Sequence, residues 1–87
     1  MKIEFDPKKA AINFTKLNVS FDEAQSCLLD TNALVFEDHD SVGESRWVLL
    51  GMSKKARLLV VIYTVRVESI RLISARKPTK KEMKNYA

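Results

Sequence analysis

Arginine side chains are concentrated on three segments of the chain that have the composition of β-strands. They are Arg46, Arg57, Arg66, Arg71 and Arg76. A guanidinium group is planar, keeps its positive charge at physiological pH and can donate two parallel hydrogen bonds to one phosphate group. If these side chains share one face of a sheet, they form a cationic groove suited to nucleic acid. For each arginine, a solvated position or an ion pair with a glutamate is the alternative.

The positive charge lies almost wholly in the C-terminal part of the chain. Residues 54–87 carry ten basic residues against two acidic ones, a net charge of +8, whereas residues 1–53 carry five basic residues against nine acidic ones, a net charge of −4. This asymmetry indicates a polyanionic partner, with nucleic acid as the first candidate. A solvated basic face is the alternative.

Three lysines extend the basic region beyond the last predicted strand: Lys77, Lys80 and Lys81. Thr79 and Glu82 have the spacing of a capping box, which predicts a short C-terminal helix. Lys80 and Lys81 then lie in its first turn, where the helix dipole disfavours a cation. A bound phosphate would remove that penalty, although a tolerant surface accounts for the two lysines equally well.

Candidates for proton transfer and base stacking are few. His39 titrates near neutral pH and can act as a base or an acid. Glu44 is an alternative base, or an ion-pair partner of Arg46. Tyr86 can donate a proton or stack on a nucleobase, and Trp47 can stack on RNA or pack within the protein or against a partner.

Several classes of protein are excluded by composition. Cys27 is the single cysteine, so no internal disulfide and no cysteine-based zinc site can form, and the lone His39 cannot build a histidine metal site. We therefore expect no metal and no other cofactor. The N-terminal segment lacks an apolar stretch and residues 57–64 are too few to span a bilayer, so we expect no signal peptide, no membrane contact and a cytoplasmic protein.

The predicted elements form one α+β domain over residues 1–87. A strand over residues 2–5 is followed by helices over residues 7–17 and 21–29, with N-caps at Asp6 and Ser20. Further strands are predicted over residues 33–37, 46–52, 57–64 and 70–76. This order predicts two N-terminal helices packed on one face of a mostly antiparallel sheet, with a short helix at the C-terminus.

Two details of this arrangement decide where side chains point. We expect Ala10, Phe14 and Leu17 to form the buried stripe of the first helix. Along the last strand, side chains alternate between the two faces of the sheet, so Arg71 and Arg76 point to opposite faces unless a β-bulge intervenes near Ser74.

The chain resembles the BrnT family of toxins from type II toxin–antitoxin systems over nearly its whole length. Its Ser-Ala-Arg-Lys segment, residues 74–77, is the most specific part. Where the family commonly has Lys-His-Gly and a tryptophan, this chain has Lys16-Leu17-Asn18 and Phe5. The matching residues are Glu4-Phe5-Asp6-Pro7, Lys9, Asn13, Lys16, Val19-Ser20-Phe21, Asp38, His39, Glu44, Arg46, Trp47, Gly51, Arg57-Leu58-Leu59-Val60-Val61, Tyr63-Thr64, Arg66, Ile70-Arg71, Ile73-Ser74-Ala75-Arg76-Lys77, Thr79, Glu82 and Tyr86.

The resemblance implies a RelE-type ribonuclease fold and a toxin that cleaves RNA and arrests growth. It also implies a BrnA-like antitoxin of the ribbon-helix-helix class, through which the complex would contact its own operator DNA. A ParE-type toxin that binds gyrase without cleaving RNA is one alternative. An inactive nucleic-acid-binding module is another.

Metal-free cleavage of RNA requires a base for the 2′-hydroxyl, positive charge for the phosphorane, and an acid for the 5′-oxygen. We expect Arg46 and Arg76 to bind the scissile phosphate, and His39 or Glu44 to transfer protons. The remaining candidates are expected to bind RNA: Arg57, Arg66, Arg71, Lys77, Lys80, Lys81, Tyr86 and Trp47.

Overall fold

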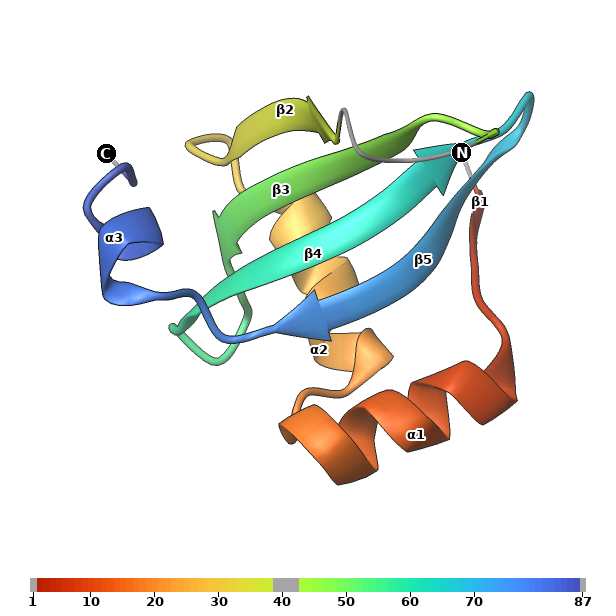
Figure 1. The fold of residues 1–87 in the computed structure, drawn as a ribbon, viewed down its shortest axis with the longest axis horizontal. Helices are drawn as coiled ribbons and strands as arrows, with labels where there is room; N and C mark the ends of the chain where they lie inside the picture. The colour runs from red at the N-terminus through yellow and green to blue at the C-terminus, as the bar shows by residue number, and fades with distance from the viewer. Residues whose placement is uncertain (1, 39–42, 87) are drawn as a thin grey trace.

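A computed structural model describes residues 2–38 and 43–86 of the chain. Within these residues the strands form one five-stranded sheet in the order β1-β5-β4-β3-β2, with β1 parallel to β5 and the other pairs antiparallel (Figure 1). The elements in chain order are β1 (Lys2–Glu4), α1 (Pro7–Leu17), α2 (Phe21–Ser26), the 3-10 turn η1 (Cys27–Leu29), β2 (Leu34–Asp38), β3 (Arg46–Met52), β4 (Leu58–Val65), β5 (Ser69–Arg76) and α3 (Lys80–Met83).

The predicted helix starts are confirmed. The Asp6 side chain accepts a hydrogen bond from the backbone N–H of Lys8, and the Ser20 side chain accepts one from that of Glu23. Asn18 ends α1 in the left-handed conformation at φ 57°, which asparagine tolerates better than most residues. The second helix is shorter than predicted, because α2 gives way after Ser26 to the tighter turn η1.

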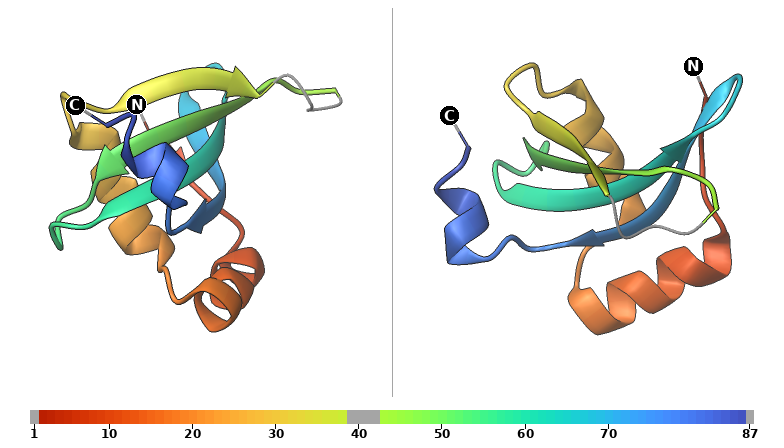
Figure 2. Two further views of the ribbon diagram at one scale, coloured as in Figure 1. Left: turned by 60° about the vertical axis from the view of Figure 1, so that its left-hand side comes forward. Right: turned by 45° about the horizontal axis from the view of Figure 1, so that its top comes forward.

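The core lies between α2 and one face of the sheet. Phe21 of α2 packs its ring edge-on against Phe5, with the ring centroids 5.4 Å apart. From the sheet, Leu59 and Val61 of β4 and Leu72 of β5 are buried against it. Among the described elements, no helix covers the other face of the sheet except at one end, where α3 follows β5 (Figure 2).

Helix α1 packs differently from the sequence-based expectation. Phe14 and Leu17 are 54% and 42% exposed, whereas Asn13 is only 7% exposed, so the predicted apolar stripe is wrong beyond Ala10, which does pack against the core. The Asn13 amide donates to the carbonyl oxygens of Val19 and Ala75 at 2.8 and 2.9 Å and accepts from the backbone N–H of Ala75 at 3.2 Å. A polar residue is buried here because it pairs with strand backbone that β1 is too short to reach.

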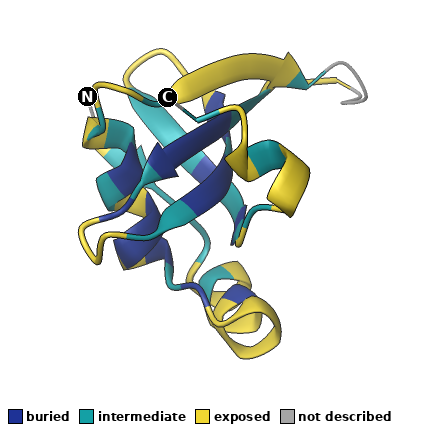
Figure 3. Ribbon diagram, turned by 90° about the vertical axis from the view of Figure 1, so that its left-hand side faces the viewer, coloured by how far each residue is buried: buried dark blue, intermediate teal, exposed yellow. Residues whose placement is uncertain are grey.

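The opposite edge of the sheet is formed by β2, which among the described strands pairs with β3 alone. Its apolar side chains Leu34, Val35 and Phe36 are 36–56% exposed, and Figure 3 shows the strand as an exposed margin of the molecule. No helix within the described residues is both long enough and apolar enough to cross a membrane.

Candidate nucleic-acid interface

A β-bulge in β5 brings its two arginines to the same face of the sheet. Ile62 of β4 lies opposite Ser74, but the next residue, Tyr63, lies opposite Leu72, so Ile73 is an extra residue on β5. Because the bulge shifts the alternation by one residue, Arg71 and Arg76 both point away from α2. The bulge that the alternation along the last strand left as an open condition near Ser74 is therefore present, and the two arginines share a face.

We call the face that points away from α2 the open face. Alternation along β3 and β4 adds Arg46 and Thr64 to it, since Trp47 and Tyr63 face the core. The residues of the open face on the three central strands are Arg46, Val48, Leu50, Val60, Ile62, Thr64, Arg71, Ser74 and Arg76.

Polar side chains cross the open face in a single line, which we call the polar row: Asp38, Arg46, Thr64, Arg71 and Glu4. The register places Asp38 opposite Arg46, Arg71 opposite Thr64 and Glu4 opposite Arg71, one residue from each strand. Neighbouring strands lie about 4.8 Å apart, so Arg46 and Arg71 flank Thr64 closely on either side. The row therefore places two guanidinium groups where one phosphate can reach both.

The arginines of this region are held only weakly by protein carboxylates. Arg71 lies 3.5 Å from Glu4, and Arg66, just beyond the end of β4, lies 3.3 Å from Glu44; all four side chains are about one-third to one-half exposed. Within residues 2–38 and 43–86, no ion pair involves the exposed Arg46. Such exposed pairs contribute about 0–1 kcal/mol, so a phosphate can compete for these groups.

Arg76 lies on the open face but at its other end. It is opposite Val60, four residues along β4 from Thr64, which corresponds to about 13 Å. Its guanidinium group makes two hydrogen bonds to Glu82 of α3, at 2.8 and 2.9 Å. This contact, with the Thr79 capping box, holds the pKa of the Glu82 carboxyl at about 2. Arg46 and Arg76 therefore face the same way without meeting at one point.

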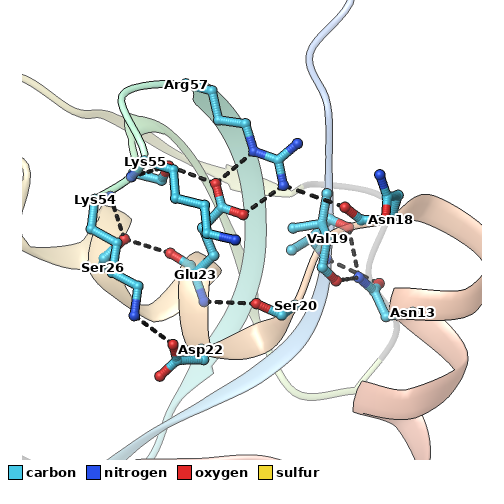
Figure 4. A network of polar contacts seen from close by, with 12 residues as sticks. Asn13, Asn18, Val19, Ser20, Asp22, Glu23, Ser26, Lys54, Lys55 and Arg57 are labelled. Atoms are coloured by element: carbon cyan, nitrogen blue, oxygen red, sulfur yellow. Dashed lines mark hydrogen bonds and ion pairs between the residues drawn. The ribbon is translucent and has the colours of Figure 1, made fainter.

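Arg57 lies on the opposite side of the sheet from the open face. Its Nε and an Nη donate to the two carboxylate oxygens of Glu23 at 2.6 and 2.5 Å, and Ser53 donates to the same carboxylate (Figure 4). Glu23 is 1% exposed, and the hydrogen bonds from Arg57 lower its pKa from 4.5 to about 2 against the opposing effect of burial. The structure thus gives Arg57 a place in a buried ion pair, away from the other arginines.

The remaining predicted site residues are scattered. Trp47 packs against the core. The Tyr86 hydroxyl donates a hydrogen bond to Asp30, which raises the pKa of Tyr86. This hydrogen bond connects the C-terminal segment to the turn before β2. Lys77, Lys80 and Lys81 are exposed around the start of α3. His39 lies outside the described residues.

Two further observations bear on other chemistries. Cys27 is buried in the core, and burial raises its pKa to about 11, so it is a packing residue and not a thiolate nucleophile. In the described part of the chain, no three His, Cys, Asp or Glu side chains gather as a metal site would require.

The lowered pKa values of the Glu23 and Glu82 carboxyl groups predict that the protein loses stability in acid. A group whose pKa is about 2 when folded and about 4.5 when unfolded stabilises the fold above pH 4.5, and this contribution is lost as the pH falls toward 2. For the buried Glu23 it is roughly 3 kcal/mol. The melting temperature should therefore be level near neutral pH and fall steeply between pH 4.5 and 2. A melting temperature that stays constant over that interval would contradict the assignment.

Comparison with known proteins identifies the family of the chain. The family model described as the ribonuclease toxin, BrnT, of type II toxin–antitoxin systems matches residues 5–82. The crystal structure of the Brucella abortus ribonuclease toxin BrnT is similar with a TM-score of 0.70 and 25% sequence identity, over 92% of this chain and 99% of that one. A search among curated proteins found no match. With its RelE-like α+β fold, the chain belongs to the BrnT family of ribonuclease toxins of type II toxin–antitoxin systems.

Proposed function

We propose that this protein is an endoribonuclease that cleaves cytoplasmic RNA without a metal ion and thereby arrests growth. The observation that carries the proposal is the polar row, where Arg46 of β3 and Arg71 of β5 present accessible guanidinium groups on either side of β4, on the open face of the sheet. Cleavage of RNA passes through a phosphorane with an additional negative charge. Preorganised cations stabilise that charge more than they stabilise the substrate, which accelerates the reaction.

In this scheme the scissile phosphate lies over the polar row. Arg66 stands beside the row, and Arg76 lies about 13 Å away along the strand, so these two side chains bind neighbouring phosphates of the same RNA strand. Lys77, Lys80 and Lys81 continue the positive surface beyond Arg76. The general base and acid are drawn from His39 and Glu44, of which Glu44 lies 3.3 Å from Arg66.

A toxin of a type II system has an antitoxin partner. We propose a BrnA-like antitoxin of the ribbon-helix-helix class, with operator DNA contacted through the antitoxin. The family match supports ribonuclease activity over gyrase binding, and the arginine spacing on the open face supports it independently because a gyrase-binding surface needs no such arrangement.

The test is to incubate the purified, antitoxin-free protein with naked RNA in the presence of EDTA. We expect cleavage that leaves a 2′,3′-cyclic phosphate and a 5′-hydroxyl, because the attacking group is the neighbouring 2′-hydroxyl. A substrate with a single 2′-deoxy sugar at the cut site is the matched control and should resist cleavage there. Cleavage that requires added Mg²⁺ would refute metal independence, and inhibition of gyrase without any RNA cleavage would favour the alternative class.

A further inference from the structure

Thr64 has a buried hydroxyl group that the protein leaves without a hydrogen bond. The residue is 2% exposed, and within the described residues its Oγ1 is the one buried side-chain oxygen or nitrogen without a partner. The other buried polar residues Asn13, Glu23 and Ser53 are all hydrogen-bonded. Burying a hydroxyl group without a hydrogen-bond partner is unfavourable. Because the other buried polar residues are hydrogen-bonded, this unsatisfied hydroxyl points to a bound ligand as its partner.

The location of this hydroxyl agrees with such a role. Thr64 is the central member of the polar row, directly opposite Arg71 and adjacent to Arg46 on the other side. Its short side chain lies between the positions of two long ones on the neighbouring strands, and both of these arginines are at least partly exposed. A ligand bound by both arginines would therefore lie next to this hydroxyl.

We propose that Thr64 is a further substrate-binding residue of this face, whose hydroxyl donates a hydrogen bond to a phosphate oxygen of the RNA held between Arg46 and Arg71. The inference rests on the proposed function and adds to it a neutral donor at the centre of the cationic pair. A hydroxyl donor positions a phosphate oxygen without adding charge, and both lone pairs of its own oxygen stay free to accept from the arginines.

Two variants separate the hydroxyl from the shape of the side chain. Thr64→Val keeps the shape and removes the hydroxyl, whereas Thr64→Ser keeps the hydroxyl and removes a methyl group. Because no protein hydrogen bond is lost, Thr64→Val should melt at the same temperature as the wild type or above it. A purely structural role of the hydroxyl would instead lower the melting temperature of that variant.

The measurements are binding of a 2′-fluoro RNA oligonucleotide, which cannot be cut, and cleavage of the matching RNA. We expect Thr64→Val to weaken binding, and to slow cleavage, by about tenfold to a hundredfold, the range for a hydrogen bond to a charged group. Thr64→Ser should remain within a few-fold of the wild type.

Each other outcome overturns the assignment in a distinct way. Wild-type binding and cleavage in Thr64→Val would refute the role of Thr64 and leave the proposed function standing. Equal losses in both variants would show that the packing of the whole side chain, and not the hydroxyl by itself, determines binding. A wild-type protein that neither binds the oligonucleotide nor cuts RNA would refute the proposed function together with this inference.

Discussion

Replacing Arg46 and Arg71 together with alanine is expected to lower the rate of RNA cleavage by about a thousandfold or more. Removal of one preorganised donor from the charge that develops in a transition state typically costs a factor of a hundred to a thousand. The two arginines flank the same position of the polar row, so a phosphate placed there loses both contacts in the double variant. The measurement is the single-turnover cleavage rate with saturating protein.

The fold should survive this change. Arg71 forms one half-exposed ion pair at 3.5 Å, which contributes at most about 1 kcal/mol, and Arg46 makes none within the described residues. The control variant is Lys8→Ala with Lys9→Ala, which removes the same charge from exposed positions on α1. Equal losses in the two double variants would mean that total charge, and not the polar row, determines the rate.

Replacing Arg57 with alanine is expected to destabilise the protein by about 3–5 kcal/mol, because the carboxylate of Glu23 would remain buried without its cationic partner. For a domain of this size, that loss lowers the melting temperature by more than about 12 °C. Cleavage per folded molecule should stay close to the wild-type value, since Arg57 lies on the side of the sheet away from the open face.

Two controls make this experiment specific. Lys54→Ala removes a neighbouring cation whose pair with Asp22 is exposed, with side chains 51% and 79% accessible, so it should shift stability by less than about 1 kcal/mol. Adding Glu23→Gln to Arg57→Ala should restore part of the lost stability, because the buried charge is then removed as well. A strong loss of cleavage in folded Arg57→Ala would show that Arg57 takes part in RNA binding after all.

The elements of the fold could be predicted because their signals are local. Caps at Asp6 and Ser20 predicted where the helices begin, and the apolar composition of residues 57–64 predicted the central strand, which the structure has at Leu58–Val65. The packing of α1 could not be predicted in the same way. The burial of Asn13 depends on a hydrogen bond to Ala75, 62 residues along the chain, and no periodic pattern contains that information.

The site was only partly predictable for a similar reason. Residue type alone predicted Arg46, Arg66, Arg71 and Arg76 as phosphate-binding candidates. Arg71 and Arg76 lie on the same face of the sheet because of the bulge in β5. A strand pattern cannot distinguish these from Arg57, because the distinction lies in the position of Glu23 on a different element. Thr64 carried one usable signal: apart from its neighbour Tyr63, it is the residue with a hydroxyl group in an apolar strand.

The two edges of the sheet, β1 and β2, differ in how readily a further strand could pair with them. On one side, β1 offers three residues and the Asn13 amide occupies the backbone of Ala75 beyond it. On the other side, β2 is an edge strand of five residues, and among the described strands it pairs with β3 alone. Two copies joined along β2 would leave no margin of similar length, so assembly by strand addition ends at a pair instead of continuing into a fibre.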